Sequence, residues 1–271
     1  MTFKEILPGQ KLRPYIKGFY FYESDSGMAF DDIVFPSGNM EVIFNLGEGV
    51  WKTKKEGAFY TTPAIELWGQ ITRPLAIRSL GKNRMLGVRF YPHSAAYFFK
   101  EKMSEFNNEI IDGSDLFGAS IKALRDRLLG STDIDDRIRW IEDYLWTRLT
   151  LSDKKHSKIQ FIGEIADHLR NPSTQEKMKS ISLHNHISTR YLTQLFTEYT
   201  GLAPKLYAKI HRFQYSLNLL QAHEQKLTGV AYDAGYFDQS HFIREFKSFT
   251  GITPSSFVTQ PLPINQLLVN N

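Results

Sequence analysis

The chain contains the sequence LTQLFTEYTGLAPKLY at residues 192–207 and the sequence FIREFKSFTGITPSSF at residues 242–257. The two stretches align without gaps at an offset of 50 residues. The identical pairs are Phe196/Phe246, Thr200/Thr250, Gly201/Gly251 and Pro204/Pro254. Apolar residues also exchange for one another at Leu192/Phe242, Tyr199/Phe249, Leu202/Ile252 and Tyr207/Phe257. This repeat predicts two copies of one supersecondary unit.

Each copy predicts where one helix ends and the next begins. Gly201 and Gly251 can adopt the left-handed backbone conformation that often follows the last turn of a helix. Pro204 and Pro254 can occupy the first turn of the following helix, where the missing N–H costs nothing. We therefore expect a helix, a glycine stop and a second helix in both copies.

The other half of each unit lies upstream of the repeat. Ser188 and Asp238 stand where a helix N-cap is needed. Shorter helical patterns precede them at Gln175–Leu183 and Leu227–Ala234. A short helix, a tight turn and a capped second helix form the helix-turn-helix layout.

Between the two units, Pro204–His223 carries a continuous helical pattern. A helix of this length spans roughly 30 Å, and one turn of B-DNA is roughly 34 Å. Two recognition helices joined by this spacer could enter successive major grooves on one face of a duplex.

Residues 158–258 resemble the DNA-binding domain of the AraC/XylS family of bacterial transcription regulators. The first unit and linker carry the resemblance at Ser188, Leu192, Leu195-Phe196, Thr200-Gly201, Pro204, Tyr207, Arg212 and Leu219-Leu220. The second unit carries it at Val230-Ala231, Gly235-Tyr236, Asp238, Ser240, Phe242, Arg244, Phe246-Lys247, Gly251 and Thr253-Pro254. The resemblance implies an all-α domain of two helix-turn-helix units joined by a long linker helix, and a sequence-specific DNA-binding regulator.

The resemblance also implies that residues near the start and along the outer face of each recognition helix contact DNA. The expected DNA-binding residues are Ser188, Thr189, Arg190, Thr193, Gln194, Gln239, Ser240, His241, Arg244 and Lys247. Arg190 or Arg244 can bond a guanine edge, and Gln194 or Gln239 an adenine edge. Thr189 and Lys247 suit phosphates. The competing interpretation is a solvated surface, with Arg244 paired to its neighbour Glu245.

Short strands are predicted in the N-terminal hundred residues, which are rich in β-branched and aromatic residues. The expected strands are Tyr15–Tyr22, Asp32–Phe35, Met40–Leu46, Gly57–Thr61, Ile65–Trp68, Leu75–Leu80 and Met85–Tyr91. Turn residues such as Pro36-Ser37-Gly38-Asn39 and Gly81-Lys82-Asn83 separate them. The pattern favours an antiparallel barrel or sandwich.

The segments Phe35–Leu46 and Gly87–Pro92 resemble the half-cupin-type barrels that serve as sensors in the same family. A barrel of this size can enclose one small ligand. The candidate effector-binding residues are Trp51, Tyr60, Trp68, Arg73, Arg89 and Phe90. Core packing is the competing role for most of them.

From about Ser94 the pattern becomes helical, and a stripe at Ile134, Ile138, Ile141, Tyr144, Leu145 and Leu149 follows the helical period. This stripe suits a dimer seam or packing on the chain's own barrel. We expect an α+β chain of two domains. Residues 1–152 form a sensor and dimerisation domain, with the barrel at about 1–92 and helices at about 94–150. A linker at 151–155, an AraC-type domain at 156–258 and a tail at 259–271 follow.

Composition sets limits on the class of protein. The 271 residues include no cysteine, which excludes disulfides, thiolate zinc sites and cysteine nucleophiles. No run of 18 apolar residues or secretory signal is evident, so we expect a cytoplasmic protein without a membrane partner. Residues 1–154 carry no net charge, whereas residues 155–271 carry the whole excess of +4. A basic module beside a neutral one suits a polyanion-binding part and a regulatory part.

Enzymatic motifs are missing from the sequence. It contains no phosphate-binding loop, dinucleotide fingerprint, nucleophile elbow or HExxH pair. His184 and His186 have metal-like spacing but no evident third ligand. Glu41 and Glu66 are strand carboxylates that sequence alone cannot pair. We expect no enzyme activity, metal or cofactor.

The sequence therefore predicts a DNA-binding transcription regulator controlled by a small effector in the N-terminal domain. The expected partners are double-stranded DNA, a small-molecule effector, a homodimer partner and, for an activator, RNA polymerase. One alternative is a ligand-binding or enzymatic barrel whose helical module no longer reads DNA. The other is a protein-interaction module, supported by the low charge of the first recognition helix.

Overall fold

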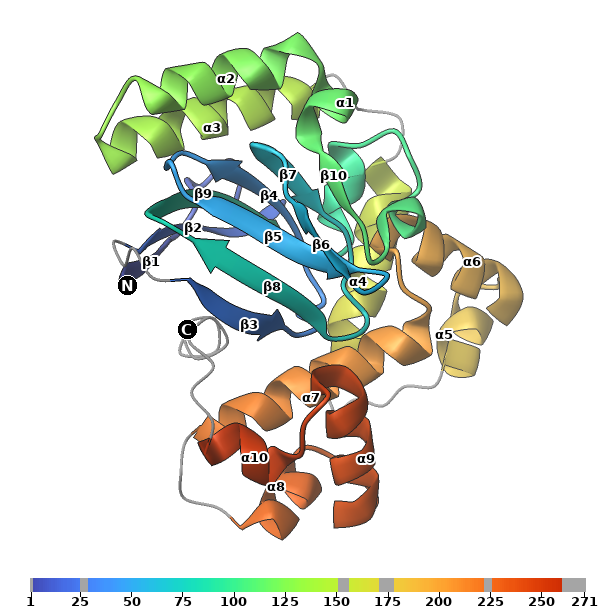
Figure 1. The fold of residues 1–271 in the computed structure, drawn as a ribbon. Helices are drawn as coiled ribbons and strands as arrows, with labels where there is room; N and C mark the ends of the chain where they lie inside the picture. Colours follow the sequence, from blue (N-terminus) through green and yellow to red (C-terminus); the bar gives the residue numbers. More distant parts are fainter. Residues whose placement is uncertain (1, 25–28, 151–155, 171–177, 222–225, 260–271) are drawn as a thin grey trace.

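The computed structural model describes residues 2–24, 29–150, 156–170, 178–221 and 226–259. Its N-terminal part consists of antiparallel strands and a layer of helices, and its C-terminal part is helical (Figure 1). This arrangement confirms the expected α+β architecture. The predicted linker at 151–155 and all but the first residue of the predicted tail lie outside the described residues.

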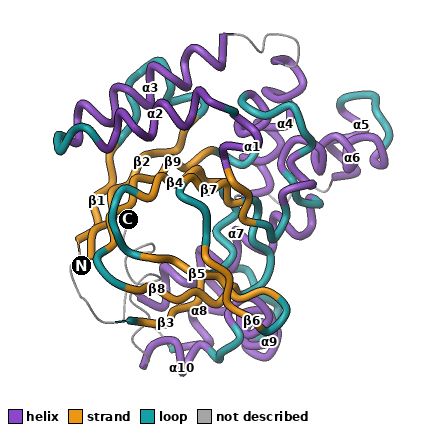
Figure 2. Tube along the Cα trace, turned by 45° about the horizontal axis from the view of Figure 1, so that its top comes forward, coloured by secondary structure: helices purple, strands orange, loops and turns teal. Residues whose placement is uncertain are grey.

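Two antiparallel sheets make up the strand part. The six-stranded sheet has the order β1 (Thr2–Ile6), β2 (Ile16–Ser24), β9 (Asn83–Phe90), β4 (Met40–Asn45), β7 (Ile65–Trp68) and β10 (Ile110–Asp112). The four-stranded sheet has the order β3 (Phe30–Val34), β8 (Leu75–Leu80), β5 (Val50–Lys55) and β6 (Ala58–Thr61). Figure 2 shows the two sheets facing each other. Strands β1, β5 and β10 were not predicted from the sequence.

Side-chain alternation gives the six-stranded sheet two buried faces. In β2, Phe19 joins the larger apolar core, whereas Tyr20 and Tyr22 join a smaller cluster with residues of the four-stranded sheet. In β4, Val42 and Ile43 divide in the same way. Because successive residues of a strand point to opposite faces, one face meets the helices and the other meets the second sheet.

A glycine makes room for an aromatic ring on the inner face of this sheet. Gly87 of β9 pairs with Tyr20 of β2. A Cβ on Gly87 would lie 2.1 Å from Cζ of the Tyr20 ring. The missing side chain therefore lets the tyrosine lie flat across the neighbouring strand.

Helices cover the outer face of the six-stranded sheet in Figure 1. They are α1 (Gly113–Phe117), α2 (Ala119–Leu129) and α3 (Ile134–Thr150), whereas the short helices η1 (Ser94–Tyr97) and η2 (Met103–Phe106) contact α6. In α3, Ile138, Ile141 and Leu145 are buried in the same core as the sheet. The predicted stripe therefore packs within its own chain, the second of the two alternatives that the sequence left open.

The C-terminal part contains both predicted helix-turn-helix units. Its helices are α4 (His156–Arg170), α5 (Met178–His184), α6 (Thr189–Thr200), α7 (Pro204–Gln221), α8 (Leu227–Asp233), α9 (Gln239–Thr250) and α10 (Pro254–Thr259). Helices α5 and α6 form the first unit, and α8 and α9 form the second. Helix α7 connects them.

The sequence repeat has the same construction twice. Ser188 accepts a hydrogen bond from the Tyr191 N–H at 3.1 Å, and Asp238 accepts one from the His241 N–H at 2.6 Å, so each recognition helix has an N-cap. At the other end, Gly201 and Gly251 take φ values of 82° and 79°. This is the left-handed C-cap expected from the sequence.

We predict that Gly87→Ala lowers the free energy of unfolding by about 1–3 kcal/mol, because the added methyl group overlaps the Tyr20 ring. Gly18→Ala is the matched control in the same sheet, since its Cβ would stand 3.6 Å from the nearest non-neighbouring atom, the Ile6 carbonyl oxygen. That change should stay within about 0.5 kcal/mol. Urea denaturation measures both, and equal destabilisation would contradict the assigned packing.

Candidate DNA-binding surface and ligand cavity

The first recognition helix, α6, separates its apolar and polar faces. Leu192, Leu195 and Phe196 are buried in the core. The predicted DNA-binding residues of this unit lie outside the core. Four of them are exposed, Ser188, Thr189, Arg190 and Gln194, and Thr193 is half-buried. The structure therefore places these residues on one side of the helix.

The second recognition helix, α9, repeats the separation. Ser240, Arg244 and Lys247 are exposed. Gln239 and His241 are half-buried. The Gln239 side chain accepts a hydrogen bond from the Thr228 hydroxyl at 2.8 Å, and the His241 ring packs edge-on against Tyr236 with centroids 5.4 Å apart. Ser240, Arg244 and Lys247 take part in neither of these two contacts.

The competing interpretation that Arg244 pairs with Glu245 is wrong. Glu245 is buried, and its carboxylate accepts hydrogen bonds from the Arg212 guanidinium at 2.6 and 2.8 Å. Lys209 and His241 lie 3.5 and 3.8 Å from the same carboxylate. Arg212 thus connects α7 to α9 and fixes the second recognition helix on the spacer helix.

Exposed aromatic rings in both helix-turn-helix units were not predicted from the sequence. Tyr232 in α8 is 82% exposed, and Phe237 in the turn before α9 is 93% exposed. Tyr191 in α6 is 44% exposed. All three residues lie outside the apolar stripes of the helices. This position in the sequence pattern could have indicated that their rings are exposed.

The first recognition helix also faces the N-terminal part. Lys102 and Ser104 form a groove with its outer face, lined further by Thr189, Arg190, Thr193, Gln194, Thr197 and Glu198. At the end of α6, the Asn107 amide donates to the Gly201 carbonyl at 2.6 Å. The predicted reading face of α6 is therefore close to residues 102–107 in this conformation.

Buried contacts connect the C-terminal helices to the loop at residues 35–39. The fully buried Gln70 amide donates to the Gly38 and Thr200 carbonyls, both at 3.2 Å. The Gln214 amide donates to the Pro36 carbonyl at 2.5 Å. The Phe35 ring packs against the rings of Phe213 and Phe257, with centroids 6.2 and 6.0 Å away.

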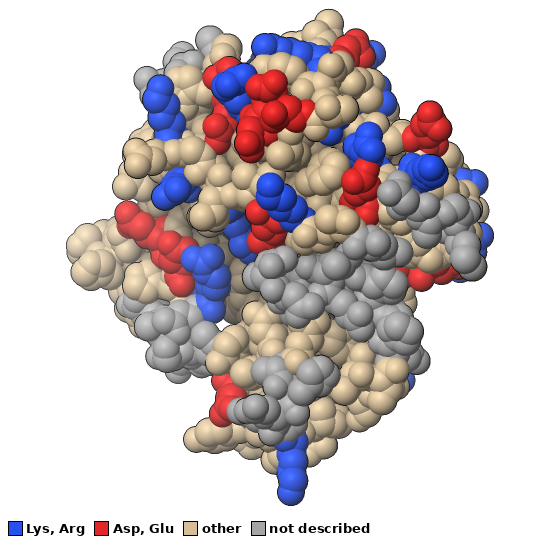
Figure 3. All heavy atoms as spheres, turned by 90° about the vertical axis from the view of Figure 1, so that its left-hand side faces the viewer, with Lys and Arg blue, Asp and Glu red and all other residues tan. Residues whose placement is uncertain are grey.

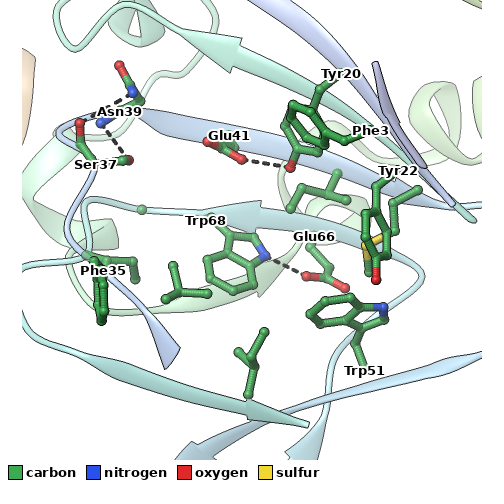
Figure 4. Close-up of a pocket in the computed structure, with 16 residues that line it drawn as sticks. Phe3, Tyr20, Tyr22, Phe35, Ser37, Asn39, Glu41, Trp51, Glu66 and Trp68 are labelled. Atoms are coloured by element: carbon green, nitrogen blue, oxygen red, sulfur yellow. Dashed lines mark hydrogen bonds between the residues drawn. The ribbon is translucent and has the colours of Figure 1, made fainter. Parts of the chain in front are cut away.

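A cavity of about 100 Å³ lies between the two sheets (Figure 4). Aromatic and aliphatic side chains form most of its wall, together with the carboxyl groups of Glu41 and Glu66. Phe35, Ser37 and Asn39, from the loop that contacts the C-terminal helices, also line it. The cavity is therefore adjacent to the contact between the two parts of the chain.

The structure brings together two of the six candidate effector-binding residues. Trp51 and Trp68 line the cavity. Tyr60 and Arg73 line a separate surface groove, and Phe90 is fully buried in the core. Arg89 lies outside the cavity lining, in a second pocket beside α7 that shares Glu41 with the cavity. The sequence analysis missed the lining residues Phe3, Tyr20 and Tyr22.

The two carboxyl groups of the cavity have different partners. Glu41 accepts hydrogen bonds from the Tyr20 hydroxyl at 2.8 Å and from the Arg89 guanidinium at 2.9 Å. Glu66 accepts from Asn45, Thr62 and Trp68, which are all neutral. Burial raises the pKa of the Glu66 carboxyl, and the hydrogen bonds oppose that rise.

Neither a metal cluster nor a membrane span is found in the described part of the chain. No group of three or more His, Asp or Glu side chains there could hold a metal ion, and His184 and His186 are exposed. No helix there is long and apolar enough to cross a bilayer.

On the face in Figure 3, acidic and basic side chains are intermixed rather than gathered into one patch.

Family profiles match both parts of the chain. A domain of unknown function (DUF6597) matches residues 4–112, and a helix-turn-helix domain matches residues 181–260. The second match confirms the helix-turn-helix prediction. The domain boundaries expected from the sequence stay predictions.

Curated relatives are named as regulators rather than enzymes. The chain is 21% identical over 187 residues to the uncharacterized HTH-type transcriptional regulator YtdP of Bacillus subtilis, covering 65% of this chain. It is 36% identical over 69 residues to the uncharacterized HTH-type transcriptional regulator YidL of Escherichia coli, covering 26% of this chain. The matches span 24% and 23% of those relatives, so the chain covers about a quarter of the length of each.

Solved structures show weaker similarity. ToxT from Vibrio cholerae has a TM-score of 0.48 and 12% identity, with 96% of this chain and 98% of that chain covered. The DNA-binding domain of AdpA in complex with a target DNA has a TM-score of 0.32 and 20% identity, with 36% and 89% covered. Both scores are below 0.5, so neither similarity carries an argument about function.

We predict a pH dependence from His211, which lies on α7 against Gly38. Its Nε2 atom is buried without a hydrogen-bond partner among the described residues. Burial, with Arg170 and Lys17 nearby, lowers the pKa of His211 to about 3. The unfolded chain takes up this proton below about pH 6.5 and the folded chain does not, so acidification favours unfolding.

Between pH 7 and pH 5, the wild type should lose about 1–2 kcal/mol more stability than His211→Gln. Urea denaturation at both pH values measures the difference. His93, whose pKa burial also lowers, is present in both proteins and cancels. Parallel losses in the two proteins would contradict the assignment to His211.

Proposed function

We propose that the chain is a sequence-specific DNA-binding transcription regulator of the AraC type, because a helix-turn-helix domain profile matches residues 181–260. The observation that carries the proposal is the repeated construction of α6 and α9. Each is capped at both ends, buries one apolar face and leaves a polar face outside the core. A polar, solvent-facing helix that follows a tight turn suits insertion into the major groove.

The spacer helix supports simultaneous reading by both units. Helix α7 has 18 residues and is therefore about 27 Å long. This length is compatible with recognition helices in major grooves about one duplex turn apart. Arg190 and Arg244 suit guanine edges, whereas Gln194 and Gln239 suit adenine edges. Thr189, Lys247 and the helix N-termini suit phosphates.

A ligand in the cavity between the sheets would control this activity. Phe35 and the loop after it form part of the cavity wall and also contact α7 and α10. Residues 102–104 and the reading face of α6 line one groove, so a duplex bound by α6 would lie beside the N-terminal part. A ligand that favours one arrangement of the loop changes DNA affinity by its differential affinity for the two arrangements.

Other partners follow from this proposal. A regulator of this kind acts where DNA is found, which in a bacterium is the cytoplasm. A homodimer would use faces other than the buried stripe of α3. Contact with RNA polymerase is expected only of an activator.

Selection from a random duplex library at near-physiological salt tests the proposal. The purified chain should enrich a motif with two contact blocks about one helical turn apart. Affinity should fall steeply with added salt, because phosphate contacts release counterions. No enrichment, with or without cell extract as a source of effector, would instead favour a protein-interaction module.

We predict that Arg244→Ala weakens binding to the selected motif by about 1–3 kcal/mol and relaxes the base preference at one position. Arg139→Ala is the matched control, because Arg139 is exposed on α3 and pairs only locally with Asp136. It should leave affinity and preference unchanged. Fluorescence anisotropy with matched and single-mismatch duplexes measures both, and equal discrimination by wild type and Arg244→Ala would exclude direct readout there.

A further inference from the structure

The wall of the cavity combines aromatic rings with acidic groups. Its rings include Phe3 from β1, Tyr20 and Tyr22 from β2, Trp51 from β5 and Trp68 from β7. Its ionisable carboxyl groups are Glu41 and Glu66, and no Lys, Arg or His is among the described residues that line it. An anionic ligand would therefore meet two carboxyl groups and no opposite charge.

The aromatic rings enclose the space from different directions. Tyr22 and Trp51 meet edge to face with centroids 6.0 Å apart, and Phe3 and Tyr20 stack at 5.5 Å. The face of an aromatic ring carries partial negative charge, so it attracts a cation, most strongly when water is excluded. Rings supplied by both sheets give the cavity the character of an aromatic cage.

Glu66 is a buried acid with no cationic partner in the described part of the chain. Its Oε1 accepts from the Asn45 amide and the Thr62 hydroxyl, each at 2.6 Å, and its Oε2 accepts from the Trp68 indole N–H at 2.5 Å. These donors hold the carboxyl group in place without neutralising a charge. A buried carboxylate lacking a counter-charge is costly, and a cation beside it removes much of that cost.

Glu41, the other acid of the cavity wall, has a cationic partner. Arg89 donates to Glu41 and also to Glu5, and Lys17 lines the same pocket as these three residues, so cations of the protein itself lie beside Glu41. Glu66 has no such arrangement. The unbalanced acid of the cavity is therefore Glu66, which lies between Trp68 and Trp51 in Figure 4.

Trp51 adds an independent sign of a missing partner. Its side chain is buried, and its indole N–H has no acceptor among the described residues. A buried donor without an acceptor costs free energy, and an oxygen on a bound molecule would satisfy it. Trp51 therefore leaves one buried donor of a cavity-lining residue without an acceptor among the described residues.

We propose that this cavity binds a compact organic cation, an amine or a quaternary ammonium ion, with its charge beside the Glu66 carboxylate and its body against the aromatic rings. The inference rests on the proposed function in so far as it names the ligand class of the controlling cavity. The volume of about 100 Å³ limits the enclosed group to roughly ten non-hydrogen atoms or fewer. Phe35, Ser37 and Asn39 connect the occupied cavity to the loop that holds the C-terminal helices.

Isothermal titration calorimetry with probes of matched shape tests the proposal on the wild-type full chain. The cations are choline and 3,3-dimethylbutylammonium, the neutral isostere is 3,3-dimethylbutan-1-ol, and the anion is 3,3-dimethylbutanoate. We expect both cations to bind at least about tenfold more tightly than the alcohol, and the anion to bind more weakly still. Equal binding of cations and alcohol, tighter binding of the anion, or no binding of any probe would overturn the proposal.

Variants locate the charge that selects the cation. Glu66→Gln should reduce the preference for choline over the alcohol to about twofold or less. Glu56→Gln, which removes one acid from an exposed turn, should keep the wild-type preference. A full preference in a folded Glu66→Gln protein would show that Glu66 does not select the cation. The wild-type comparison decides the proposal if Glu66→Gln fails to fold.

The outcome of the calorimetry does not depend on DNA binding, because the titration contains no DNA duplex. Cation binding without an enriched DNA motif would remove the proposed regulator and keep the cavity assignment. An enriched DNA motif without a preference for cations would keep the proposed regulator and remove the assignment of the cavity to a cation.

Discussion

The buried amide of Gln70 connects three parts of the chain that the rest of the structure keeps apart. It follows β7, beside the cavity wall, and its two N–H groups reach the loop before β4 and the end of α6. Gln70 is fully buried, so water cannot replace either acceptor if one of them moves away. The loop at residues 35–39 and the first recognition helix are therefore energetically coupled. At the end of α6, the Gln70 and Asn107 amides together hold the carbonyls of Thr200 and Gly201 against the strand part.

The C-terminal domain could be predicted from sequence because its determinants are local. The caps, glycine stops and apolar stripes of α6 and α9 each lie within a few residues of one another, and the repeat at an offset of 50 residues reinforced them. The partner of Glu245 was out of reach, because Arg212 lies 33 residues away on another helix. Burial of that acid also depends on how α9 packs on α7, which no local pattern encodes.

The strand part was predicted as a class and not in detail. Strand β5 carries four polar residues in six, Lys52-Thr53-Lys54-Lys55, so propensity did not favour it. The cavity depends on register, which decides whether a residue faces inward. Trp68 faces the cavity and Phe90 the helix-covered core, although both are strand aromatics. Tyr20 of β2 and Glu66 of β7 border the same space only when β9 and β4 pair between their strands.

The hydrogen bonds between the two parts share one property. Gln70, Asn107 and Gln214 each donate to a main-chain carbonyl of the other part, those of Thr200, Gly201 and Pro36. Every amino acid supplies such an acceptor, so the receiving residues can be exchanged without loss of these bonds wherever the backbone path is kept. Evolution can therefore redesign the reading faces of the helices and the lining of the cavity separately. The hydrogen bonds between the two parts would then be retained while both the ligand that is bound and the DNA sequence that is read change.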